Sequence, residues 1–301
     1  MVSVRDDMNQ DKIQKVAIED LFSFYQDKGD LRLYNYFQSL IKLSASICFM
    51  RNYKSIQALE EVFTIDQVID CVLNEKMPSL LRASFCDLLI TLHLDKDPLE
   101  TLVVPIMTRV WDDIEQGTLE TPISNAMIHP KLLELKPALS KFIKSTNGLL
   151  IASLVEFNHL ILKMLNVLET MIGLGFYNSN EELIEVTKPL IQILNGQFDL
   201  QNEEEKMLYD KQVEETGDES IPLFRDEESQ KDRYARTPQN MVIMEIKDKI
   251  IDISKILMSF QNNTRLSMFL NDFGLLEKKG GLAINKYCQI YQQAINAGNF
   301  K

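Results

Sequence analysis

Apolar residues recur at intervals of three and four along almost the whole chain, and this spacing is the strongest constraint on its fold. The clearest run is Val242, Ile246, Ile250, Ile253 and Leu257. Residues spaced in this way share one face of an α-helix, whereas a half-buried strand alternates every second residue. No strict alternation of five or more residues is found, and 11 Gly and 9 Pro in 301 residues are few for a protein of many strands. The sequence therefore predicts an all-α fold.

The same periodicity, with capping residues at its edges, predicts about ten helices. Thr64 with Gln67 and Asp97 with Glu100 have the spacing of capping boxes, in which the two residues satisfy free amide groups of the first turn. Pro98 then occupies the first helical position, where a missing N–H costs nothing. The expected limits are 12–26, 31–50, 64–75, 79–94, 98–115, 130–145, 148–173, 179–196, 241–262 and 281–297, with a shorter helix at 264–272.

One segment, 199–239, departs from this pattern. It carries thirteen acids against six bases, so it holds −7 of the net charge of −12, with few aromatic residues and no apolar stripe. Such a composition buries too little surface to offset the entropy of ordering, and it predicts a mobile, disordered acidic loop. We expect an armadillo-like helical domain at 1–198, a mobile acidic linker at 199–239, and C-terminal helices at 240–301 that pack back on the same solenoid.

Helices that pair at a spacing of roughly 35–50 residues indicate an armadillo or HEAT-like helical solenoid. No repeat is visible residue by residue. A fold of this kind has no chemistry of its own, but it offers surfaces and transmits displacement.

Charge and cysteine usage limit the partners and the compartment. The net charge of −12 makes nucleic acid and anionic membranes unfavourable partners. The four cysteines form no Cys-x-x-Cys pair, which favours a reducing compartment. Residues 1–12 are charged and lack the apolar run of a signal peptide, so we expect a cytosolic chain. Charged residues interrupt the apolar segment 148–174, which favours a buried helix over a membrane span.

A calcium loop is the one metal site that the sequence suggests, at Asp95 and Asp97. An EF-hand loop that began at Asp95 would need a ligand, a glycine and a glutamate where Leu99, Glu100 and Ile106 stand. We therefore expect a corner that links helix layers, and keep a weak calcium site at Asp95, Asp97 and Glu100 as the alternative.

The other candidate residues favour structural roles. Cys86 on a leucine-rich helix is expected to be an inert thiol, and His159 a hydrogen-bonded core residue. Trp111 is expected to be a core anchor, with a partner contact as the alternative. Arg82 is expected to bind an acid on a neighbouring helix or a carbonyl at a helix end. We assign no catalytic, cofactor-binding or metal-binding residue and expect no enzyme.

A kinase could modify Thr237. Arg233 and Arg236 precede this residue and Pro238 follows it. A phosphate there would add to the negative charge of the acidic segment. Thr237 is kept as a possible phosphosite.

Several stretches resemble a known family. Residues 81–100 read LRASFCDLLITLHLDKDPLE, which includes Arg82, Phe85, Asp95, Asp97 and Pro98, and VPIMTRVW follows and ends at Trp111. Both resemble the cytosolic helical, modulatory region of inositol trisphosphate receptors, of the ryanodine and inositol trisphosphate receptor homology type. Further stretches agree in the same order at 30–48, 174–194 and 242–273. Asp87 stands where the family pattern tends to be basic, and residues 274–301 match nothing in it.

The resemblance implies a regulatory segment of a tetrameric, ligand-gated calcium-release channel on the cytosolic face of the endoplasmic reticulum. Its armadillo-like solenoid would relay ligand binding to the pore, and its partners would be other domains and subunits of the channel. No residue of 1–301 matches the family's ligand-binding trefoil or its pore, so no cofactor or conduction residue is implied. The alternative is an independent, cytoplasmic armadillo-like scaffold that binds protein partners.

Overall fold

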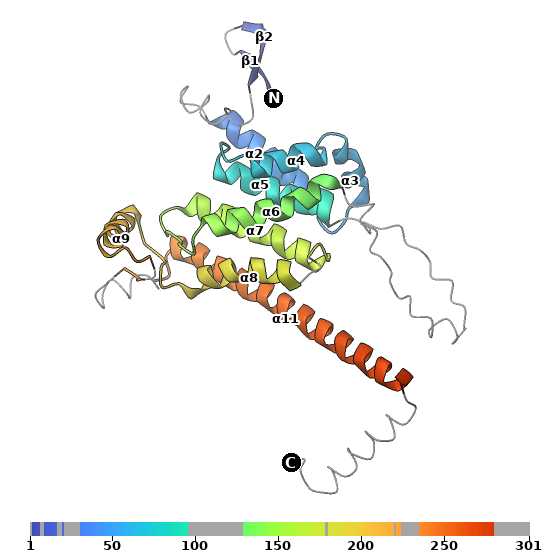
Figure 1. Ribbon diagram of the computed structural model, residues 1–301. Helices are drawn as coiled ribbons and strands as arrows, with labels where there is room; N and C mark the ends of the chain where they lie inside the picture. The colour runs from blue at the N-terminus through green and yellow to red at the C-terminus, as the bar shows by residue number, and fades with distance from the viewer. Residues whose placement is uncertain are drawn as a thin grey trace. The chain divides into compact units, whose positions relative to one another are not determined.

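The computed structural model describes residues 2–6, 9–16, 20, 31–95, 129–177, 180–219, 221–223 and 235–279. Contacts divide the chain into two compact units, Met1–Ile251 and Asp252–Lys301. The first unit contains the layered helices (Figure 1).

The described residues form nine α-helices and one π-helical turn, which confirms the predicted all-α class. They are α2 (Arg32–Cys48), α3 (Tyr53–Glu60), α4 (Ile65–Leu73), α5 (Ser79–Leu89), the π-helical turn η1 (Ile90–Leu94), α6 (Pro130–Ser145), α7 (Val155–Gly173), α8 (Asn180–Asn195), α9 (Glu203–Thr216) and α11 (Pro238–Lys279). The helices expected at 98–115 and 281–297 lie outside the described residues.

A two-stranded antiparallel hairpin stands at the N-terminus, where a helix was predicted. Strands β1 (Val2–Asp6) and β2 (Asn9–Val16) pair with Val2 opposite Val16. The expectation of helix near 12–26 is therefore wrong at 12–16, and the remainder, apart from Asp20, lies outside the described residues. Valine and isoleucine at positions 2, 4, 13 and 16 favour extended backbone, because branching at Cβ restricts the side chain in a helix.

Helix α5 is the centre of the layers formed by α2, α4, α5 and α7, here called the first layers. It packs against α7, α2 and α4, and eight of its eleven residues are buried (Figure 1). A helix that is apolar on nearly every side is stable only when neighbours cover all of its faces. Contacts of α4 with α6, and of α6 with α7 and α8, continue the layers.

Helix α7 is the second buried helix, and it begins later than predicted. The backbone at Asn147 and Gly148 has positive φ, and a Cβ added at Gly148 would lie 3.0 Å from the Cβ of Gln192. Residues 150–153, an isolated bridge at Ile151 followed by a turn, then lie beside 200–201, with the Ala152 N–H donating to the Leu200 carbonyl at 2.8 Å. These pairings use backbone groups that a helix from 148 would need, so α7 starts at Val155.

The acidic segment differs from the loop that its composition predicted. Residues 203–216 form helix α9, and Asp199 is buried and forms an ion pair with Lys247 of α11. The prediction of a segment without helices is thus wrong at α9. Local capping, described below, accounts for this helix.

Helix α11 is one helix where two were predicted, at 241–262 and 264–272. No glycine or proline interrupts 239–273, so no residue breaks the backbone hydrogen-bond ladder there. Lys249 near its start pairs with Glu169 of α7 at 2.9 Å.

Candidate functional site

Arg82 lies where three helices meet. Its side chain is 6% exposed on α5, and its Nε donates to the carbonyl of Val72 near the end of α4 at 2.9 Å. Its guanidinium also lies 5.7 Å from the ring centroid of Phe142 on α6, within cation–π range. Of the two partners predicted for Arg82, the structure therefore gives the carbonyl at a helix end. Burial lowers the pKa of Arg82, but its guanidinium remains a cation at physiological pH.

Phe142 extends this contact to α7. Its ring centroid lies 6.1 Å from that of Phe157, with the two planes tilted by 59°. Arg82, Phe142 and Phe157 thus join α4, α5, α6 and α7 in one chain of contacts. Because packed cores move between discrete arrangements, such a chain can pass a displacement from one layer to the next.

The α5–α7 contact contains two further pairs. The Cys86 thiol lies 3.8 Å from the sulfur of Met164, and Asp87 pairs with Lys163 at 2.9 Å. Burial, with a smaller contribution from Asp87, raises the pKa of Cys86 to about 12, so the thiol stays protonated near neutral pH. This agrees with the predicted inert thiol. Asp87, an acid where the family pattern tends to be basic, has a basic partner on α7.

Asp95 ends the π-helical turn and joins it to the corner after α2. Its carboxylate accepts from the Nε of Arg51 at 2.9 Å and forms an ion pair with it. The buried His93 in the same turn has its Nε2 2.9 Å from the Phe63 carbonyl. Asp95 therefore joins η1 to the corner after α2, while the corner hypothesis, which also involves residues that the structure does not describe, stays a prediction.

Of the other family-motif residues predicted for the site, only Phe85 lies within the described residues. Phe85 is 2% exposed in the core of α5. Asp97, Pro98 and Trp111 lie outside the described residues, so the calcium alternative stays untested there. No group of three or more His, Cys, Asp or Glu able to hold a metal ion occurs in the part of the chain that the structure describes.

Thr237 precedes the first residue of α11. Its Oγ1 accepts from the Asn240 N–H at 3.2 Å, as a helix N-cap does. Arg236 beside it is exposed, whereas Arg233 lies outside the described residues. Phosphorylation of Thr237 remains a prediction.

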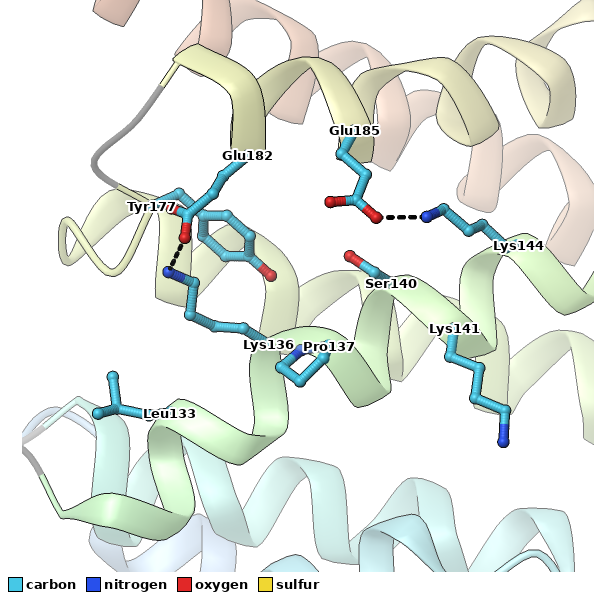
Figure 2. A pocket seen from close by; sticks show the side chains of 9 residues that line it. All are labelled: Leu133, Lys136, Pro137, Ser140, Lys141, Lys144, Tyr177, Glu182 and Glu185. Carbon is cyan, nitrogen blue, oxygen red and sulfur yellow. Dashed lines mark hydrogen bonds and ion pairs between the residues drawn. The ribbon is translucent and has the colours of Figure 1, made fainter.

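A pocket of about 500 Å³ separates α6 from α8 on the surface of the first unit. An ion pair bridges α6 and α8 at each end of the pocket (Figure 2): Lys136 with Glu182 at 2.8 Å and Lys144 with Glu185. Both pairs are part-exposed, and pairs of this kind contribute about 0.2–1 kcal/mol each.

Tyr177 lies between these ion pairs (Figure 2) and is 4% exposed. The Nζ of Lys136 is 5.0 Å from its ring centroid. Its hydroxyl has no hydrogen-bond partner among the described residues. Burial, and then Glu182 and Glu185, raise the pKa of the phenol well above its usual value, so Tyr177 is neutral near physiological pH.

None of the helices in the described part of the chain is long and apolar enough to span a bilayer.

One family model matches the first layers. Residues 37–104 match the ryanodine receptor junctional solenoid repeat. The match runs from within α2 through α3, α4, α5 and η1, and therefore includes Arg82, Phe85 and Asp95. It confirms the predicted helical solenoid. The match relates residues 37–104 to the cytosolic helical region of intracellular calcium-release channels, without distinguishing one type of channel from another.

Sequence reasoning missed several parts of this site. The Arg82–Phe142 contact joins residues sixty positions apart, and no local sequence pattern predicts it. The π-helical turn and the buried Tyr177 hydroxyl also had no local signal in the sequence. The two prolines inside helices, Pro137 in α6 and Pro189 in α8, are visible in the sequence. Pro137 lines the pocket, so a proline within a predicted helix was the available clue to it.

Proposed function

We propose that this chain is a coupling module from the cytosolic region of an intracellular calcium-release channel of the inositol trisphosphate receptor type, and that it relays ligand binding toward the pore. The observation that carries the proposal is the match of residues 37–104 to the junctional solenoid repeat. The ordered resemblance of four longer stretches between 30 and 273 supports the inositol trisphosphate receptor as the closer type.

The contact chain of Arg82, Phe142 and Phe157 supports a mechanical role. It connects the segment that matches the solenoid repeat to α6 and α7, which lie outside the match. Coupling between sites in proteins typically amounts to 1–3 kcal/mol, or about 5–150-fold in affinity. The buried Arg82 guanidinium contacts α4 and α6 from α5, and we expect it to carry part of this coupling energy.

Several further assignments belong to the proposal. The module performs no catalysis, and its partners are other domains and subunits of a tetrameric channel. Its place is the cytosolic face of the endoplasmic reticulum, and it contacts neither membrane lipid nor nucleic acid. The net charge of −12 supports the last point, because an acidic surface repels phosphate groups.

The test uses the native gene with an epitope tag and Phe142→Leu introduced into it. Leucine keeps an apolar side chain but removes the ring that faces Arg82 and Phe157. We expect the tagged product to sediment with endoplasmic reticulum membranes. Calcium release from permeabilised cells should need about 5-fold or more inositol trisphosphate in the variant.

Lys206→Ala is the matched control, because Lys206 is exposed on α9, a helix without buried residues. It should leave the response unchanged. A tagged product that stays in the soluble fraction, with normal release in the Phe142→Leu cells, would contradict the coupling role. That result would favour the alternative, an independent scaffold that binds protein partners.

A further inference from the structure

The pocket between α6 and α8 has charged ends. The described residues that line it include three lysines and two glutamates, so the lining has a net charge of +1 in a chain of −12. The other described residues of the lining are Leu133, Pro137, Ser140 and Tyr177. Its volume of about 500 Å³ lies within the range of small-molecule sites, about 300 to 1,000 Å³. The pocket therefore has room for a small organic ligand and favours a negative one.

The Tyr177 hydroxyl is a hydrogen-bond donor at the middle of this pocket. Tyr177 is 4% exposed, and Figure 2 shows its hydroxyl between the two ion pairs, pointing toward α6. The hydroxyl has no hydrogen-bond partner among the described residues. Buried polar groups are nearly always hydrogen-bonded, because a buried donor that has lost water and gained no acceptor is costly. A ligand that brings an acceptor to the middle of the pocket would satisfy this donor.

Two lysines supply positive charge at the ends of the pocket. Lys136 pairs with Glu182 at 2.8 Å, and Lys144 pairs with Glu185. An ammonium group has three N–H donors, so a lysine that is paired with one carboxylate can bind a second. Lys136 and Lys144 are eight residues apart, which is a rise of about 12 Å along α6. One ammonium at each end therefore fits a ligand that has an anionic group at each of its own ends.

The lining favours carboxylate groups over phosphate groups. Phosphate sites in proteins commonly use arginine side chains or the N–H groups of a helix N-terminus. No arginine is among the described residues that line this pocket. Helix α8 has Glu181 and Glu182 in its first turn, and these acids repel a group that carries two negative charges. A carboxylate carries one negative charge, which one lysine matches.

We propose that this pocket binds an elongated organic dicarboxylate, with one carboxylate at Lys136, the other at Lys144, and a central oxygen that accepts from the Tyr177 hydroxyl. The Nζ of Lys136 lies 5.0 Å from the centroid of the Tyr177 ring, and the hydroxyl is covered from solvent. The ligand therefore reaches the hydroxyl when the Lys136 side chain changes rotamer and turns to the ligand carboxylate. The proposal goes beyond the coupling role and does not depend on it.

The experiment is isothermal titration calorimetry of the full chain at constant ionic strength with two probes, pimelate and γ-ketopimelate. The two dicarboxylates have the same length, and only γ-ketopimelate has a central carbonyl oxygen. We expect saturable binding of γ-ketopimelate with a dissociation constant of about 1 mM or lower. Pimelate should bind roughly 5-fold more weakly, because it offers no acceptor to Tyr177. Tyr177→Phe should remove this difference by weakening only the binding of γ-ketopimelate.

Lysine variants test the two ends of the pocket. Lys136→Met and Lys144→Met should each raise the dissociation constant of γ-ketopimelate by about 10-fold or more, because each removes a charged donor. Lys131→Met is the matched control, since Lys131 lies on the same helix, pairs with Asp70 and does not line the pocket. It should leave the constant unchanged. Circular dichroism establishes that each variant is folded, and an unfolded variant is replaced by Lys136→Gln or Lys144→Gln, for which the same loss is expected.

Three results would overturn the proposal. The first is a wild type that gives no saturable heat with either dicarboxylate, and the second is binding that survives both lysine substitutions, which would place the ligand elsewhere. The third is inorganic phosphate that binds as tightly as γ-ketopimelate and is lost in the same variants, because the pocket would then accept anions in general. A preference for γ-ketopimelate that persists in Tyr177→Phe would likewise overturn the assignment of Tyr177 as its donor.

Discussion

Helices α7 and α9 have similar lengths, 19 and 14 residues, but they are stabilised in opposite ways. Nine residues of α7 are buried, whereas α9 has none. Helix α7 packs against α5 and α6, and its first turn is uncapped by any side chain. Helix α9 makes its side-chain contacts with nearby residues: Tyr209 packs on Phe198 and donates to the Glu219 carbonyl at 2.8 Å.

Helix α9 is stabilised by capping interactions at its two ends instead of by burial. The Asn202 side chain accepts from the Glu205 N–H at 2.9 Å, and the Glu205 carboxylate accepts from the Gln201 N–H at 2.8 Å. Three glutamates in its first turn also favour the positive end of the helix dipole. Gly217, at φ 67°, ends the helix with its N–H donating to the Val213 carbonyl. A segment can thus be helical through local interactions alone, while composition predicts only that it has no core.

The largest expected difference between α7 and α9 is in the free energy of unfolding lost when one leucine in each helix is truncated to alanine. Leu168→Ala in α7 removes a side chain that is 0% exposed, and such cavities cost about 2–5 kcal/mol of unfolding free energy. Leu208→Ala in α9 removes a side chain that is 55% exposed and should change that free energy by less than about 0.5 kcal/mol. Urea denaturation of both variants measures this. Equal losses would show that α9 is packed after all.

The second effect tests whether Arg82 links the packed layers. Arg82→Ala leaves the Val72 carbonyl without its charged donor and should cost about 1.5–3 kcal/mol. Arg82→Lys keeps the charge but loses the planar guanidinium above Phe142, so it should restore only part of the loss. Full recovery in the lysine variant would reduce the role of Arg82 to its charge.

The third effect concerns the local stabilisation of α9. Asn202→Ala removes the cap and should cost the helix about 1 kcal/mol. Amide hydrogen exchange should accelerate by about fivefold in 203–216 while the midpoint of global unfolding stays the same. Asn202→Asp keeps an acceptor at the cap and is the matched control. A shift of the global midpoint in Asn202→Ala would contradict the separation between the two helices.

The sequence predicted the elements whose signals are local. Expected limits of 130–145 agree with α6, because Pro130 fixes its first residue, and 64–75 contains α4, which follows Thr64. At Thr64 the position was right, although its side chain makes no capping hydrogen bond. The predicted helix limits were wrong where backbone hydrogen bonds to a distant segment decide them. Helix α7 is the example, because the residues expected to begin it pair with 200–201 instead.

The candidate site was less predictable than the helices. Arg82 was identified, but its partner was left open between an acid and a carbonyl, because that choice depends on which helix end the fold brings to it. Phe142 and Tyr177 were not identified, since Phe142 is one apolar residue among many in its helix, and Tyr177 lies between α7 and α8, where no helical spacing marks it. A sequence gives the faces of helices, and the pairs formed across those faces come from the packing.

The fourth effect is a small gain at the edge of the packed layers. Tyr177→Phe removes a buried hydroxyl that has no partner among the described residues, and keeps the ring under Lys136. The free energy of unfolding should stay constant or rise by up to about 1 kcal/mol. Tyr177→Ala, which also removes the ring, should lose about 3–5 kcal/mol. If Tyr177→Phe is destabilised by more than about 1 kcal/mol, the hydroxyl has a partner in solution.

The smallest expected effect is at Asp95, which separates a structural corner from a calcium site. The Arg51–Asp95 pair is 47% and 43% exposed, so solvent screens it and Asp95→Asn should cost at most about 0.5 kcal/mol. This cost should be independent of calcium, because Arg51 already occupies the carboxylate. Calorimetry at millimolar calcium should show no saturable heat in the wild type. A rise of the melting temperature with calcium that Asp95→Asn with Asp97→Asn abolishes would instead establish a metal site, at which calcium would act directly on the contact between Asp95 and Arg51.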